Sequence, residues 1–207
     1  MTKKKFLGFY WTLPVPWTGF QALPRNVDEA AQASTTIRYQ RERVKGWVKE
    51  ERGELIGEEA FLELAPDRGS EQLVSVIEKL LKYCKCENAK LVLVDFSEAF
   101  GWRKLPGFEK LGLEREDICE PLDPSPILMD GAEFDPIQHF RTWRKIEDTH
   151  VSGKGDRKAA LAEAIQDLVT DNETNSSLAQ ALNASGQFTP NGKPWTADNL
   201  RKFIKTL

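Results

Sequence analysis

The chain has 207 residues, of which 40% are hydrophobic and 29% are charged, and it contains six tryptophans and eleven phenylalanines. This composition excludes an intrinsically disordered protein, and the length allows one domain with a proper core plus a small appendage. The formal net charge of −3 gives no global attraction to nucleic acid, so any DNA contact must come from a local basic surface.

The sequence also bears on compartment and cofactors. No stretch approaches the roughly 18 apolar residues of a membrane helix. The segment from Phe6 to Tyr10, after a lysine-rich start, is too short and too aromatic for a signal peptide. Cys84, Cys86 and Cys119 are odd in number and lack zinc-site spacing, so we interpret them as reduced thiols. We expect a cytoplasmic protein with no metal, no cofactor and no membrane contact.

The first half of the chain predicts alternating strands and helices. Strands are expected over residues 6–13, 54–64 and 89–96. One long amphipathic helix is expected over 28–51, with Gly53 at its C-cap, and a second follows a cap at or near Ser70. This order predicts an α/β fold: a mostly parallel sheet flanked by helices.

The second half divides differently. Five prolines interrupt every candidate element through Asp135, so we expect short strands and loops there. Helices are expected from Asp135 to about His150 and over 157–169, with a linker at 151–156. We therefore predict three segments: an α/β domain over 1–134, connecting or dimerisation helices over 135–170, and a DNA-binding element over 171–207.

The last thirty residues predict two short helices around a turn. Ser177 to Asn183 has an amphipathic pattern, Gly186 ends it, and Thr196 can cap a final helix. In that helix the apolar side chains should face inward and the cations outward. Two short helices at an angle with exposed basic groups are a DNA-docking geometry. The outward cations would be Lys193, Arg201, Lys202 and Lys205.

The same residues resemble a known family. Leu182-Asn183, Gly186, Thr189, Gly192 and Trp195-Thr196, followed by an apolar helix, are similar to the C-terminal helix-turn-helix of large serine recombinases, the resolvase and invertase superfamily. In that family the glycines shape the turn, the tryptophan packs the small core and the last helix approaches DNA. The resemblance covers about thirty residues, and with the cations it implies these DNA-binding positions: Lys193, Trp195, Thr196, Asn199, Arg201, Lys202 and Lys205.

Residues 6–105 more faintly resemble the catalytic domain of the same family. The run from Ser34 to Gln40-Arg41 is similar to the family's Ser-x-x-x-Gln-Arg helix. Asp67-Arg68 before the next helix and the Leu-Val-Leu-Val-Asp95 strand follow in the family's order. The resemblance implies a resolvase-like α/β domain joined to a small all-α helix-turn-helix.

The chemistry of that family is missing from the matching positions. Its members carry Tyr-x-Arg-x-Ser at the end of the first strand, where the serine attacks a DNA phosphate and arginines stabilise the transition state. Here Phe9, Trp11 and Leu13 replace the tyrosine, arginine and serine. Weak substitutes are Thr12 beside the missing serine, and the arginines Arg68 and Arg103. The resemblance therefore implies a DNA-binding or regulatory protein that does not cleave DNA.

Two alternatives stay open at this point. An active strand-transfer enzyme would use Thr12 or Ser34 as its nucleophile and would form covalent protein-DNA adducts. A protein-interaction module without DNA binding would tolerate neutralisation of the four outward cations. Under the main hypothesis the protein binds DNA. It also forms an oligomer with a second copy of the chain or with a related recombinase.

Two smaller motifs are interpreted as structural. Glu58, Glu59 and Glu63 could suggest a divalent metal, but a solvated strand face is the expected role. Gly153-Lys-Gly lacks the remainder of a phosphate-binding loop and is expected to be linker.

Overall fold

The computed structural model describes residues 3–64, 70–96, 118–168, 174–190 and 192–206. The chain forms two compact units. The sheet unit comprises Met1–Pro14 and Ala22–Arg141, and the helical unit comprises Val15–Gln21 and Thr142–Leu207. The three segments expected from the sequence remain a prediction about domain organisation.

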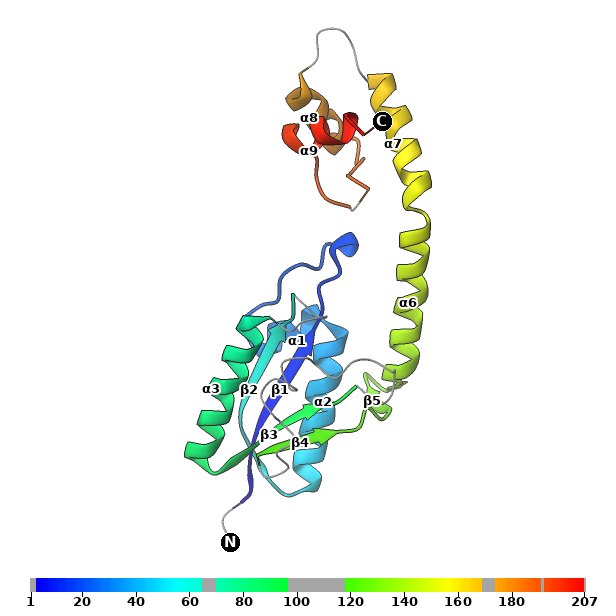
Figure 1. The fold of residues 1–207 in the computed structure, drawn as a ribbon. Helices are drawn as coiled ribbons and strands as arrows, with labels where there is room; N and C mark the ends of the chain where they lie inside the picture. The colour runs from blue at the N-terminus through cyan, green and yellow to red at the C-terminus, as the bar shows by residue number, and fades with distance from the viewer. Residues whose placement is uncertain (1–2, 65–69, 97–117, 169–173, 191, 207) are drawn as a thin grey trace. The chain divides into compact units, whose positions relative to one another are not determined.

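In the described residues of the sheet unit, four strands form a wholly parallel sheet in the order β2-β1-β3-β4 (Figure 1). The strands are β1 (Lys5–Thr12), β2 (Glu54–Leu62), β3 (Ala89–Val94) and β4 (Cys119–Leu122). The α/β class and the parallel sheet predicted from the sequence are confirmed.

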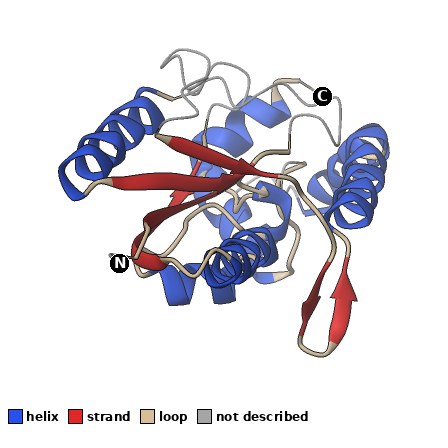
Figure 2. Cartoon of the chain, turned by 90° about the horizontal axis from the view of Figure 1, so that it is seen from below, coloured by secondary structure: helices blue, strands red, loops and turns tan. Residues whose placement is uncertain are grey.

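Helices cover both faces of this sheet (Figure 2). Side chains of a strand alternate between faces, and here both sets are apolar. On β1, Phe6 and Tyr10 pack with α1 (Val27–Ala33) and α2 (Thr35–Glu50). Leu7 and Phe9 pack on the opposite side with α3 (Glu71–Glu87). The core therefore consists of two layers with the sheet between them.

The long helix expected over 28–51 is wrong in one respect, because Ser34 divides it into α1 and α2. The Ser34 backbone is extended (φ −135°, ψ 115°), and its Oγ accepts a hydrogen bond from the Ile37 amide at 3.3 Å. The residue that turns the chain after α2 is Arg52 (φ 53°), not Gly53. The buried residues of α1 and α2 keep three- and four-residue spacing on both sides of Ser34, so the sequence pattern does not reveal the break. The cap predicted at Ser70 for α3 is confirmed.

The proline-rich stretch holds short strands, as expected for its described part. Pro121 lies in β4, which pairs with β3 at the edge of the described sheet. An edge strand tolerates proline because one side needs no backbone donor. β5 (Ile127–Met129) and β6 (Ala132–Phe134) form a separate hairpin, whose turn residues Asp130 and Gly131 both have positive φ.

The remaining helices are α6 (Pro136–Ser152), α7 (Lys154–Leu168), α8 (Asn175–Ala184) and α9 (Ala197–Ile204), and a short 3-10 helix, η1, spans Pro16–Thr18. The linker expected at 151–156 is wrong. The Gly153 amide donates to the Thr149 carbonyl at 3.0 Å, and the Arg157 amide donates to the Gly153 carbonyl at 3.1 Å. Gly153 is the single residue between α6 and α7, and these two hydrogen bonds carry the backbone from one helix into the next. Within the described chain, every helix is too short or too polar to cross a bilayer.

The stability of the sheet unit should fall in mild acid because of His139 on α6. Its ring lies 5.1 Å from that of Phe134 and 5.5 Å from that of Phe140, and burial lowers its pKa below the ordinary value near 6.5. Below that ordinary value the unfolded chain binds a proton that the folded chain does not. The free energy of unfolding should therefore decrease as the pH falls from about 6.5 through the lowered pKa, by at most about 1.4 kcal/mol per pH unit.

Urea denaturation at a series of pH values measures this dependence. His139→Gln should flatten the curve below pH 6.5. His150→Gln, a change in the helical unit, serves as the control. A curve that His139→Gln leaves unaltered would contradict the assignment.

Candidate nucleic-acid interface

A small core holds α7, α8 and α9 together. Its buried members include Leu178 and Leu182 from α8, Leu200 from α9 and Ile165 from α7. The inward face predicted for α9 is confirmed. Leu200 is 0% exposed, and Phe203 and Ile204 are partly buried against the same cluster. The sequence did not predict that α7 would join this core. The segment is therefore a three-helix arrangement rather than an isolated pair.

Asn183 at the end of α8 fixes the chain where α9 begins. Its Nδ2 donates to the Trp195 carbonyl at 2.9 Å, and its Oδ1 accepts from the Trp195 amide at 2.7 Å. Between them, Gly186 and Gly192 have positive φ values of 74° and 73°, a backbone conformation that favours glycine. The Thr189 amide donates to the Lys193 carbonyl at 2.8 Å and closes the turn. The turn is thus specified by side-chain and backbone contacts together.

Three of the seven predicted DNA-binding residues hold the junction between the turn and α9. Trp195 is 4% exposed and packs edge-on against Phe203, with ring centroids 5.2 Å apart. Thr196 and Asn199 form a capping box: Thr196 Oγ1 accepts from the Asn199 amide at 3.2 Å, and Asn199 Oδ1 accepts from the Thr196 amide at 2.8 Å. The predicted cap at Thr196 is confirmed. The side chains of Trp195, Thr196 and Asn199 therefore stabilise the start of α9.

The other four predicted residues, all cations, are exposed. They are Lys193, Arg201, Lys202 and Lys205. Residues 174–207 contain these four cations and a single acid, Asp198, which gives a side-chain charge of +3 in a chain of −3. The charge of the chain is therefore divided unevenly, and its C-terminal segment is basic.

Two neighbours modify this basic surface. Asp198 Oδ1 lies 2.8 Å from an Arg201 guanidinium nitrogen, and Asp198 Oδ2 lies 2.7 Å from Lys202 Nζ. Lys158 of α7 donates from Nζ to the Thr206 carbonyl at 3.2 Å and lies 5.9 Å from the centre of the Phe203 ring. Sequence reasoning missed Lys158, because its position beside α9 depends on the packing of α7. We define the cationic face as Lys158, Lys193, Arg201, Lys202 and Lys205.

The end of β1 holds apolar side chains at the positions where the resemblance to serine recombinases would place a nucleophile. Phe9 is 0% exposed, and Trp11 packs edge-on against Phe96 with centroids 6.4 Å apart, while Leu13 is partly buried. Thr12 is 8% exposed. A buried hydroxyl must first become accessible before it can attack a DNA phosphate.

The other residues proposed for catalysis add little to this site. Ser34 is 7% exposed, and its Oγ caps α2. Arg68 and Arg103 lie outside the described residues. Neither hydroxyl therefore lies open at the surface of the sheet unit.

Gln40 occupies the place where β1 and β3 separate. The two strands pair from Lys5 to Gly8 of β1. Beyond that point the side chain of Gln40 provides the hydrogen-bond partner for the Trp11 backbone. Gln40 is 0% exposed; its Nε2 donates to the Trp11 carbonyl at 2.7 Å, and its Oε1 accepts from the Trp11 amide at 3.2 Å. In open parallel sheets this split is where ligands commonly bind. Here a side-chain amide fills it.

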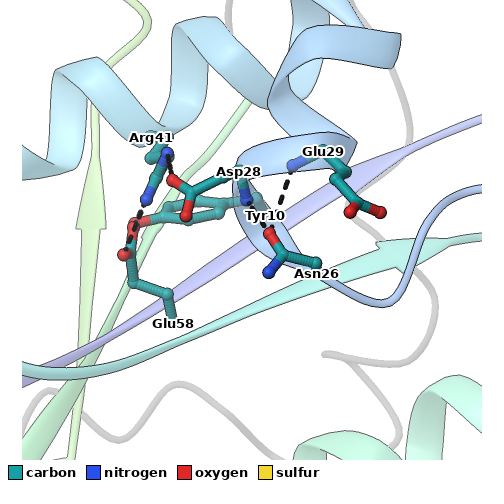
Figure 3. A network of polar contacts seen from close by, with 6 residues as sticks. All are labelled: Tyr10, Asn26, Asp28, Glu29, Arg41 and Glu58. Atoms are coloured by element: carbon teal, nitrogen blue, oxygen red, sulfur yellow. Dashed lines mark hydrogen bonds and ion pairs between the residues drawn. The ribbon is translucent and has the colours of Figure 1, made fainter.

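A polar network ties α1 and α2 to the sheet (Figure 3). Arg41 Nε donates to Glu58 Oε1 at 2.8 Å, and Tyr10 Oη donates to the same oxygen at 3.0 Å. A second nitrogen of Arg41 lies 2.6 Å from Asp28 Oδ1. Burial acts to raise the pKa of Glu58, but the hydrogen bonds from Arg41 and Tyr10 outweigh it and lower that pKa. The network joins α1, α2 and β2 and serves as a structural clamp.

The solvated acidic face expected at Glu58, Glu59 and Glu63 is therefore wrong. Glu58 belongs to the clamp, and burial raises the pKa of Glu59. Glu63 is 0% exposed and accepts from the Ser70 amide and hydroxyl at 3.2 and 3.1 Å. Successive residues of a strand point to opposite faces, which disperses a cluster that looks contiguous in the sequence.

Among the described residues, no three His, Cys, Asp or Glu side chains converge to hold a metal ion. Burial raises the pKa of the Cys84 thiol to about 11, which keeps it protonated at neutral pH. Comparisons with protein-family models, with curated proteins and with solved structures find no match.

Proposed function

We propose that this protein is a non-cleaving relative of the serine recombinases that binds DNA through the cationic face of α9 and the turn before it. The observation that carries the proposal is the exposure of four cations, Lys193 in the turn and Arg201, Lys202 and Lys205 on or at the end of α9, whose opposite side is buried in a three-helix core. In helix-turn-helix proteins the last helix of such a unit enters the major groove. Lysine and arginine around it neutralise phosphates and release counterions.

The sheet unit supports the same family assignment. Its parallel four-strand sheet with helices on both faces is consistent with a resolvase-like domain. The positions that would carry the nucleophile and its arginine are Leu13 and Trp11, and the nearby Thr12 is buried. Binding without cleavage is therefore the role these residues favour.

Such a protein would act by occupying a DNA site alone or with a partner. The partner would be a second copy or a related recombinase, and α6 offers a surface for it. Ile146 and Val151 on α6 are 46% and 63% exposed. The two side chains lie five positions apart, about 140° around the helix, so each offers a separate apolar contact to a partner.

Neutralising two cations of α9 should reduce the salt dependence of binding. The double variant Lys202→Ala and Lys205→Ala removes up to two phosphate contacts, so the slope of log affinity against log salt should become shallower by about 2. Fluorescence anisotropy of the full chain with a labelled random-sequence duplex, at salt from about 50 to 200 mM, measures this slope.

Lys79→Ala with Lys82→Ala is the matched control, because both lysines are exposed on α3 and the change in charge is the same. This control should keep the wild-type slope. Equal slopes in all three proteins would contradict the proposal. An absence of binding at low salt would favour a protein-interaction module instead.

A further inference from the structure

Asp198 lies among the cations that are proposed to contact DNA. It is the sole acidic residue in 174–207 and lies in the first turn of α9, with its side chain 57% exposed. Both of its oxygens are engaged, one by Arg201 and the other by Lys202. The hydrogen bond from Lys202, followed by that from Arg201, lowers the pKa of Asp198, so the carboxylate is charged at neutral pH. Half of the four cations predicted to contact DNA thus face one carboxylate.

This arrangement opposes binding to phosphate on any sequence. A phosphate that approaches Arg201 or Lys202 must compete with the carboxylate and is repelled by its charge. The three side chains are 57% to 71% exposed, and ion pairs in water are weak, so the cations can be released at modest cost. Asp198 therefore weakens phosphate contacts without preventing them.

The affinity for DNA that Asp198 removes can be recovered only where a base offers a hydrogen-bond donor to the carboxylate. The first residues of a recognition helix are those that reach base edges in the major groove. Among the groups presented there, the exocyclic amino group of cytosine suits a carboxylate, whereas guanine presents only acceptors and adenine places an acceptor beside its donor. A carboxylate at this place distinguishes bases in two ways, because it attracts the amino group of cytosine and repels the acceptor atoms of the purines.

We infer that Asp198 is the specificity-determining residue of this interface: it suppresses binding to arbitrary DNA and selects a site with cytosine opposite the first turn of α9. The inference rests on the proposed DNA-binding function. This role is additional to the helix-dipole stabilisation that an acid in the first turn supplies. Asp198 belongs neither to the cap, which Thr196 and Asn199 form, nor to the core that Leu200 faces.

The test is Asp198→Asn, which keeps the size and removes the charge. Affinity of the full chain for a random-sequence duplex should rise about three- to tenfold, because Arg201 and Lys202 become free for phosphates. Selection from a randomised duplex library should enrich cytosine at one position with the wild type and lose that preference with the variant. In a Lys202→Ala background the gain from Asp198→Asn should shrink.

Asp156→Asn is the control, since Asp156 is exposed in the first turn of α7 and the change in net charge is identical. It should leave affinity and base preference as in the wild type. If the wild type binds with salt dependence and Asp198→Asn matches Asp156→Asn in affinity, or selects the same bases as the wild type, the role of Asp198 is overturned. If none of these proteins binds at low salt, the DNA-binding function fails and the inference with it.

Discussion

Replacing Trp195 with alanine should unfold α8 and α9 while the sheet unit stays folded. The indole is 4% exposed and packs between Leu182, Leu200 and Phe203 in the small core. Removing a buried tryptophan costs about 3–5 kcal/mol, which is comparable to the entire stability of so small a core. Amide hydrogen exchange should show lost protection over 174–206 and unchanged protection in β1 and β3.

Phe188→Ala is the control for this experiment, because Phe188 is 44% exposed in the same segment. It should leave exchange in α8 and α9 nearly as in the wild type. Retained protection of α9 in Trp195→Ala, or equal effects of the two substitutions, would show that the indole does not hold these helices.

Gln40→Leu should destabilise the sheet unit by about 2–4 kcal/mol. Leucine preserves the approximate size but leaves the amide and carbonyl of Trp11 without the side-chain partner that now binds both. Each backbone group that loses its partner in a dry site costs about 1–3 kcal/mol. For a domain of this size the melting temperature should fall by about 10 °C, as measured by circular dichroism.

Gln32→Leu is the matched control, since Gln32 is exposed on α1 of the same unit. Its melting temperature should remain close to that of the wild type. A Gln40→Leu protein as stable as this control would mean that water satisfies Trp11 and that the amide does not hold the split between β1 and β3.

The sequence predicted the elements whose apolar pattern is regular. The strands β1, β2 and β3 and the helix α3 appear within a few residues of their expected limits. β1 and β3 are apolar runs of the kind buried in a parallel sheet, and the apolar face of α3 follows the helical period. Errors came where one residue decides the backbone. Ser34 ends one helix and starts the next, and Gly153 separates α6 from α7 by a single residue instead of a linker.

The candidate interface was only partly accessible from the sequence. The outward cations of α9 follow from helical spacing alone. The dual hydrogen bond of Asn183 to Trp195, the burial of Trp195 and the approach of Lys158 all depend on contacts between segments that are distant in the chain. Gln40 lies in the run that resembles the recombinase Ser-x-x-x-Gln-Arg helix. Its contact with Trp11 could be found only once the positions of β1 and β3 were known.

The most direct test of DNA binding is to locate the duplex on the protein. Amide chemical shifts of the full chain should be followed by NMR during titration with a short random-sequence DNA duplex at low salt. We expect the largest changes in the turn over 189–196 and along α9, small changes in α3, and reversal of the changes when salt is added. Unchanged shifts at low salt, or changes centred on α3 instead, would show that α9 and its turn are not a DNA-binding surface.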